Sequence, residues 1–159
     1  MKRVMYAMVV LMFAAVAAGP SMGQANPFLG TWKLNVAKSK VEGGPAPKAL
    51  TRTVTADGAG AKYAFEGQAA DGSKLSYSFT TNYDGKDVAV SGSGMPGGAD
   101  TITLKRTGSK SEGVLKKGGK EIGKASSEVS KDGKTTTVKT SVKTSDGKEV
   151  KSESVYEKQ

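Results

Sequence analysis

Two arginines have the chemistry best suited to holding a small anionic ligand. Arg52 and Arg106 are the only arginines beyond residue 25, in a chain that otherwise uses lysine. Strand alternation places both on apolar faces that we expect to point inward. A buried guanidinium needs an anion or several acceptors, and a carboxylate or phosphate would satisfy it in bidentate fashion. Two other interpretations stay open: each arginine reaches solvent at a strand end, or it pairs with an internal acid such as Glu66 or Glu128.

Aromatic side chains could supply the apolar part of the same site. Such a face either lines a pocket or packs as ordinary core. If it lines a pocket, the apolar part of a ligand would contact five residues: Trp32, Tyr63, Phe65, Tyr77 and Phe79. The anionic head would be held by Arg52, Arg106 or Tyr156. Together these eight are the candidate ligand-binding residues.

The composition argues against an enzyme. The chain has no histidine and no cysteine, so it lacks the usual neutral-pH base, the thiolate nucleophile and the commonest zinc ligands. The aspartates at 57, 71, 84, 132 and 146 each precede a glycine and are expected in turns. The sequence contains no Gly-x-Ser-x-Gly motif and no close set of oxygen ligands for calcium. We therefore expect no catalytic residues, no metal site and no cofactor.

The first 25 residues have the pattern of a secretory signal peptide. Lys2 and Arg3 precede an apolar run over 4–18, and small residues at 23 and 25 suit a signal peptidase. The alternative is a membrane anchor, but the run is shorter than the ~20 residues that a spanning helix needs. We expect cleavage after Ala25, leaving one domain over 26–159 in a periplasmic or secreted protein.

The charge is strongly positive, with a formal net value of +9. An exported basic protein can meet anionic lipid headgroups, lipopolysaccharide or acidic polysaccharide. The lysines are spread along the chain, however, and lysines also protect exposed strand edges from aggregation. We favour that second role. Nucleic acid is not an expected partner, because no dense arginine cluster with interleaved aromatics occurs.

Turn signals divide the rest of the chain into short alternating segments. Five Asp-Gly pairs, together with glycines at 108, 118 and 119, are typical of hairpin turns. Two Gly- and Pro-rich stretches, 38–48 and 91–99, are expected to be loops. The predicted strands are 28–36, 49–56, 61–68, 74–83, 87–91, 100–107, 111–117, 121–130, 134–144 and 148–157.

This arrangement predicts an all-β domain with little helix. A long meander of antiparallel strands avoids exposed edges by closing into an up-and-down barrel, here of about 8–10 strands. In the first strand, alternation turns Phe28, Gly30, Trp32, Leu34 and Val36 to one face. Apolar residues become sparse after Thr107, so the inward face of the C-terminal half must hold Ser and Thr. A barrel of this size can leave an interior cavity for one small ligand.

The first and last strands resemble those of the lipocalin and fatty-acid-binding (calycin) superfamily. Gly30-Thr31-Trp32 is similar to its Gly-x-Trp mark, in which the tryptophan packs across the closed end of the barrel. Tyr156 matches the tyrosine of the Arg-x-Tyr pair that holds a ligand carboxylate in fatty-acid-binding proteins, although Ser154 replaces the arginine. The whole of 26–159 also resembles small exported bacterial lipocalin-like proteins of unassigned activity. The helical lid and the disulfides of the superfamily are missing here.

Two functions are compatible with these features. The first is an extracytoplasmic monomer that binds a small apolar or amphipathic molecule inside the barrel, with the resemblance implying that ligand class. The second is a structural or interaction domain that acts through its basic surface on envelope polymers or a protein partner. A continuous cavity above ~300 Å³ would favour the first function, and a filled interior would favour the second.

Overall fold

The structure is a computed structural model that describes residues 25–159. Within that range every long element is a β-strand, and two single-turn 3₁₀ helices, η1 and η2, are the only helical segments. The elements in chain order are β1 (Gly30–Leu34), η1 (Val36–Lys38), β2 (Lys40–Glu42), β3 (Ala49–Asp57), β4 (Gly60–Gln68), β5 (Lys74–Thr81), β6 (Asp84–Ala89), β7 (Ser91–Ser93), η2 (Pro96–Gly98), β8 (Thr101–Thr107), β9 (Lys110–Lys117), β10 (Lys120–Val129), β11 (Thr135–Lys143) and β12 (Glu149–Lys158).

The prediction of an all-β, antiparallel barrel is confirmed. Ten of the twelve strands coincide with the ten predicted segments to within a few residues. The other two, β2 and β7, are three-residue strands inside the stretches expected to be loops. They form because β12 and β5 each leave an unpaired edge beside them, and each short strand pairs with three residues of that edge.

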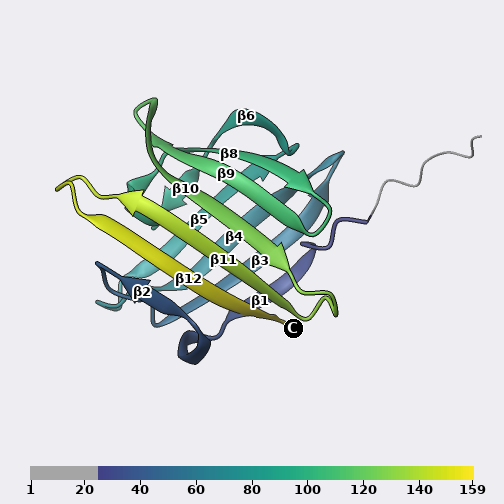
Figure 1. Cartoon of the computed structure of the whole chain (residues 1–159), viewed down its shortest axis with the longest axis horizontal. Coiled ribbons are helices and arrows are strands. Elements are labelled where there is room, and N and C mark those ends of the chain that lie inside the picture. Colours follow the sequence, from purple (N-terminus) through teal and green to yellow (C-terminus); the bar gives the residue numbers. More distant parts are fainter. Residues whose placement is uncertain (1–24) are drawn as a thin grey trace, which may run out of the picture.

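The strands form one nearly closed barrel (Figure 1). Neighbours follow the order β6-β8-β9-β10-β11-β12-β1-β3-β4-β5-β7, so the first and last long strands lie side by side. The segment 84–93 bends so that β6 pairs with β8 while β7 pairs with β5. This bend joins the two ends of the sheet and leaves little edge exposed. Strands β9 to β12 form one wall, and β3 to β5 form the wall behind it.

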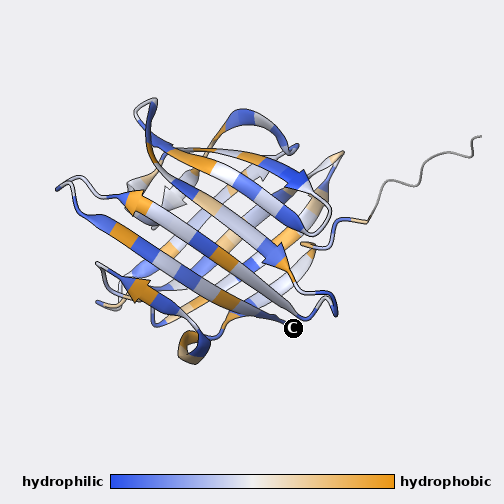
Figure 2. Cartoon of the chain, in the orientation of Figure 1, coloured by the Kyte–Doolittle hydropathy of each residue, from blue (hydrophilic) through white to orange (hydrophobic). Residues whose placement is uncertain are grey.

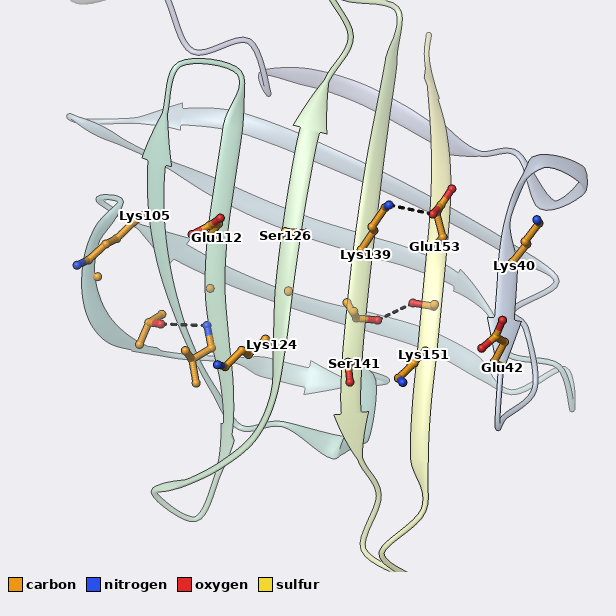
Figure 3. A pocket seen from close by; sticks show the side chains of 17 residues that line it. Lys40, Glu42, Lys105, Glu112, Lys124, Ser126, Lys139, Ser141, Lys151 and Glu153 are labelled. Carbon is orange, nitrogen blue, oxygen red and sulfur yellow. Dashed lines mark hydrogen bonds and ion pairs between the residues drawn. The ribbon is translucent and has the colours of Figure 1, made fainter.

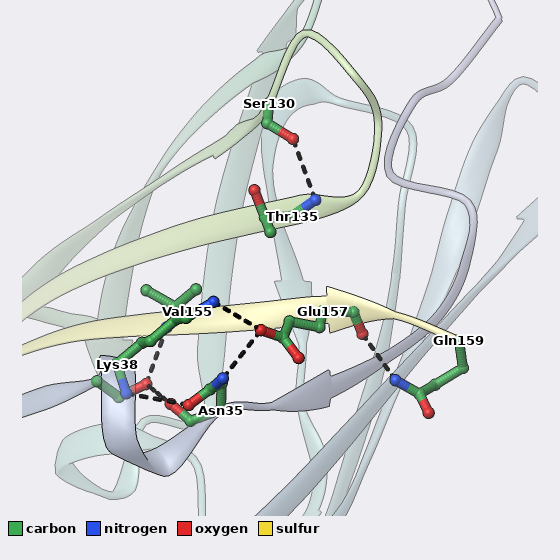
Figure 4. Close-up of polar contacts among 8 residues, drawn as sticks. Asn35, Lys38, Ser130, Thr135, Val155, Glu157 and Gln159 are labelled. Atoms are coloured by element: carbon green, nitrogen blue, oxygen red, sulfur yellow. Dashed lines mark hydrogen bonds and ion pairs between the residues drawn. The ribbon is translucent and has the colours of Figure 1, made fainter.

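The seam between β1 and β12 is reinforced by polar contacts from η1 (Figure 4). Asn35 caps η1 by accepting a hydrogen bond from the Lys38 backbone N–H, at 3.0 Å. Its side-chain amide also donates to Glu157 Oε1 at 2.9 Å, and Lys38 Nζ lies 3.0 Å from the same oxygen. Ser39 Oγ accepts from the backbone N–H of Val155 at 2.9 Å. The chain can therefore leave β1 without separating from β12.

The Gly-x-Trp match has a physical basis in β1. Gly30 adopts φ 123°, and a Cβ there would lie 2.9 Å from Lys158 Cε, so a larger residue would be strained and crowded. Two positions along, Trp32 is fully buried. Val36 was expected on the same inward face but is exposed, because β1 ends at Leu34 and η1 turns the chain away.

Hydrophobic and hydrophilic residues alternate along the strands (Figure 2), and the core that they build is richer in large side chains on one side. The main cluster of buried residues joins Phe28, Trp32, Val54, Tyr63 and Phe79 from the N-terminal half to a smaller number from the C-terminal strands. The inward face of β10 to β12 holds serine and threonine among valines, as the scarcity of apolar residues predicts.

One predicted turn is displaced. The Asp84-Gly85 pair does not form the turn between β5 and β6 but lies at the start of β6, in a bulge of its pairing with β8. The turn falls instead at Asn82 and Tyr83, and Tyr83 takes φ 57°. Hydrogen bonds from the Tyr83 backbone N–H to Thr81 Oγ1 and between the Tyr83 and Tyr63 hydroxyls hold this unfavourable conformation.

The predicted signal peptide lies outside the described residues, apart from Ala25 at its end. Between residues 25 and 159, the structure has no helix with the length and apolar character of a membrane span.

Candidate ligand-binding cavity

The barrel encloses a cavity of about 310 Å³. It opens at the end where the loops 43–48, 69–73 and 144–148 meet η2, and Pro45, Pro47, Ala70, Met95 and Thr144 line that mouth. Strands from both halves of the chain contribute to its walls. The volume is at the lower end of the range typical of small-molecule sites, so the cavity suits one compact ligand.

The opposite end is closed by the start of the domain. Phe28 and Trp32 are fully buried, and the indole Nε1 donates to the Phe28 carbonyl at 2.8 Å. Asn26 Nδ2 donates to the Tyr83 hydroxyl at 3.0 Å, which in turn lies 2.9 Å from the Tyr63 hydroxyl. These contacts close this end of the barrel.

Arg52 lies at the inner part of the cavity and is only 2% exposed. Its guanidinium carbon lies 5.4 Å from the ring centre of Trp32 and 5.0 Å from that of Tyr156. Among residues 25–159, Nε and Nη2 have no hydrogen-bond partner, and every ion pair uses lysine rather than arginine. Burial lowers the pKa of Arg52, and nearby tyrosine hydroxyls only partly offset this effect. The site therefore holds a buried cation without an anion.

The wall formed by β4 and β5 is aromatic. Tyr63 stacks on Phe79 with ring centres 5.0 Å apart, and Phe65 stacks on Tyr77 at 4.5 Å. Burial raises the pKa of Tyr63 and Tyr77, and it raises the pKa of Tyr156 to about 12. These phenols stay neutral at ordinary pH, so none of them supplies a negative charge to Arg52.

The structure brings together six of the eight candidate residues. The cavity is lined by Arg52, Tyr63, Phe65, Tyr77, Phe79 and Tyr156. Trp32 lies beneath the Arg52 guanidinium at the closed end, outside the lining. Arg106 is also apart: it is half-buried near the closed end, where Nη1 donates to the Gly108 carbonyl at 3.3 Å and Cζ lies 5.4 Å from the Tyr83 ring centre. A role for these eight residues in binding stays a prediction.

The proposed internal acids do not lie near Arg52. Glu66 is exposed on β4, and Glu128 forms a surface ion pair with Lys110 at 3.7 Å. Arg52 therefore forms an ion pair with neither Glu66 nor Glu128. It is also too buried to reach solvent at a strand end.

Several lining residues were not identified individually from the sequence. They are the hydroxyl residues of β9 to β12 and the mouth residues: Ser111, Ser127, Thr140, Ser152, Ser154, Pro45, Pro47 and Met95. Alternation indicates an inward Ser and Thr face, but the depth of each hydroxyl depends on strand register, which short-range patterns do not specify.

A larger hollow of about 1040 Å³ lies on the outer face of β8 to β12 and is open to solvent (Figure 3). Cross-strand neighbours there alternate in charge, in the order Lys105, Glu112, Ser126, Lys139, Glu153 and Lys40. Lys139 Nζ lies 3.2 Å from Glu153 Oε2. Opposite charges directly across strands support the register of a sheet. Five lysines and three glutamates line this hollow, so much of its positive charge is compensated, and the interior cavity is the candidate site.

Between residues 25 and 159, no three acidic side chains gather closely enough to hold a metal ion. The cavity presents a cationic fork at the inner end, a flat aromatic wall and a hydroxyl-bearing wall.

Comparison with solved structures places this architecture among calycin-like barrels. The zebrafish ileal bile acid-binding protein, solved with cholic acid, aligns with a TM-score of 0.50 and 14% identity over 84% of this chain and 100% of its own. Rv2717c from M. tuberculosis aligns with a TM-score of 0.52 and 17% identity over 89% of this chain and 98% of its own. No family model and no curated protein matches the sequence. At such identities the likeness establishes the fold, a calycin-like barrel, and nothing finer.

Proposed function

We propose that this protein binds one small amphipathic molecule inside the barrel, with an anionic head at Arg52. The observation that carries the proposal is the Arg52 guanidinium, which lines the cavity at 2% exposure with Nε and Nη2 unpartnered. An unpaired buried charge lowers the stability of the fold by several kcal/mol. A bound anion would offset this cost by pairing with the guanidinium.

The chemistry of the head follows from the shape of guanidinium. Its planar fork of N–H donors matches a carboxylate or phosphate in bidentate fashion. Trp32 and Tyr156 lie against the guanidinium and limit its rotation, which leaves the fork oriented before a ligand arrives. A monoanionic head is the simplest group that this arrangement fits.

The tail would lie toward the mouth. The stacked Phe65–Tyr77 pair lies level with Arg52 in the strand register and offers a flat apolar surface, which Leu75 and Met95 continue to the opening. The neighbouring fold supports this choice, since the zebrafish protein was solved with cholic acid, itself an amphipathic carboxylic acid. The absence of histidine and cysteine supports a binding role rather than a catalytic one.

We place the protein outside the cytoplasm, as a periplasmic or secreted monomer. This part of the proposal is supported by the signal-peptide pattern of residues 1–25. Action through the basic surface is the less favoured alternative, because three glutamates lie among the five lysines of the outer hollow and offset part of their charge.

The experiment is a fluorescent-probe displacement assay with myristate and tetradecanol, which share a tail and differ in the charge of the head. Myristate should bind at least ~10-fold more tightly, since a hydrogen bond to a charged group contributes about 1.5–3 kcal/mol. Equal affinities, or no binding of either compound, would contradict the proposal.

A further inference from the structure

The inward side chains of β9 to β12 form rows that cross the wall opposite the aromatic one. Near the mouth the row is apolar: Leu115, Gly123, Val142 and Val150. Two rows follow at mid-depth, first Gly113, Ala125, Thr140 and Ser152, then Ser111, Ser127, Val138 and Ser154. The innermost row is Val129, Thr136 and Tyr156. We call the five serine and threonine residues of the two middle rows the hydroxyl belt.

The hydroxyl belt has hydrogen-bonding capacity left over. Thr140 Oγ1 lies 2.5 Å from Ser152 Oγ, and Ser111 Oγ lies 2.7 Å from Ser127 Oγ. Each hydroxyl carries one donor hydrogen and two acceptor lone pairs. Within a pair only one hydrogen is used, so the other hydrogen and several lone pairs remain free for a group inside the cavity.

Ser111 is buried and the other four hydroxyl residues are half-buried, and packing does not explain why this wall is polar. Valine occupies neighbouring inward positions on the same strands, at 138, 142 and 150, so this wall accepts apolar side chains. Polar groups turned toward an enclosed space cost free energy unless they find partners. An independent feature of the same cavity points to a ligand, namely the almost fully buried Arg52 with its unpartnered nitrogens.

The row of the belt nearer the mouth, with Thr140 and Ser152, lies at a definite distance from the inner end. Ser152 is four residues from Tyr156 along β12, and Tyr156 contacts the Arg52 guanidinium. Four residues of extended strand span about 13 Å. A ligand whose head reaches Arg52 would therefore present the middle of its body to Thr140 and Ser152.

We propose that the hydroxyl belt recognises an oxygen substituent in the middle of the ligand, which makes the ligand class an amphipathic anion with a mid-chain hydroxyl or keto group. This inference rests on the proposed function, since it assumes a head at Arg52. The apolar row of Leu115, Val142 and Val150 limits the oxygen on the mouth side of the belt, while the aromatic wall accepts the unsubstituted side.

The test compares myristate with mid-chain hydroxymyristate on three proteins in the same displacement assay. The unmodified protein should bind the hydroxy acid about five- to tenfold more tightly, as one added hydrogen bond predicts. Thr140→Val keeps the side-chain shape and removes its hydroxyl, so this preference should fall to about twofold or less while myristate affinity is retained. Ser141→Ala is the matched control, because the Ser141 side chain lies on the outer face and donates to Glu149 at 2.8 Å. It should keep the full preference.

Three results would overturn the inference. If myristate binds but the hydroxy acid gains nothing, the hydroxyl belt does not select ligands and the proposed function still stands. If the preference survives in Thr140→Val, the oxygen is recognised elsewhere. If neither acid binds the unmodified protein, both the proposed function and this inference fail. A melt of each variant in urea separates loss of binding from loss of folding.

Discussion

Replacing Trp32 with alanine should lower the free energy of unfolding by about 3–5 kcal/mol, as deletion of a fully buried large aromatic does. The side chain is 0% exposed and supports the closed end, where its Nε1 bonds the Phe28 carbonyl. Its ring also lies 5.2 Å from Lys158 Nζ and 5.4 Å from the Arg52 guanidinium carbon. Truncation would open a cavity and remove both cation–π contacts together.

The measurement is a urea melt followed by circular dichroism, because Trp32 is the only tryptophan and its fluorescence disappears with the substitution. Val36→Ala is the control, since Val36 follows β1 but is exposed. Its effect should stay within ~0.5 kcal/mol. A loss of less than ~1 kcal/mol for Trp32→Ala would show that the tryptophan does not support the closed end.

Replacing Arg52 with methionine should weaken myristate binding by about 10- to 150-fold, which corresponds to the loss of about 1.5–3 kcal/mol. Methionine keeps an unbranched apolar stem in place of the arginine stem but removes the guanidinium that lies against Trp32 and Tyr156. The empty protein should be as stable as before or about 1 kcal/mol more stable, because the substitution removes a buried charge that no acid compensates. A combination of weaker binding with unchanged stability distinguishes a ligand contact from a structural role.

Arg106→Met is the matched control, since the two arginines are alike except in their place. Arg106 bonds the Gly108 carbonyl at the closed end and does not line the cavity. Its replacement should leave myristate affinity within about twofold of the unmodified protein. If Arg106→Met weakens binding and Arg52→Met does not, the head lies at the closed end rather than beside Tyr156.

The sequence predicts the strands well because their signals are local. Asp-Gly pairs and alternation act over a few residues, and they locate ten strands and the inward position of Arg52 correctly. Alternation specifies a face but no depth. For that reason it predicts an inward side chain for both Arg52 and Arg106. Strand register and barrel geometry place only Arg52, of these two, beside the cavity.

The features that escaped prediction depend on contacts between distant segments. β2 forms because β12 has a free edge beyond β1, and the turn at Tyr83 depends on a hydroxyl contact with Tyr63, twenty positions earlier. The hydroxyl belt also depends on contacts between distant segments. A serine-rich inward face follows from composition, but its alignment into two neighbouring rows depends on the registers of four strands.

The most direct test of anion capture at Arg52 is nuclear magnetic resonance of the chain from residue 26, with isotope-labelled arginine. Only Arg52 and Arg106 would then give Nε–H signals, so each can be assigned with one substitution. Titration with myristate should shift the Arg52 signal strongly and slow its hydrogen exchange, while the Arg106 signal stays in place. An Arg52 signal that does not respond to saturating myristate would contradict the account.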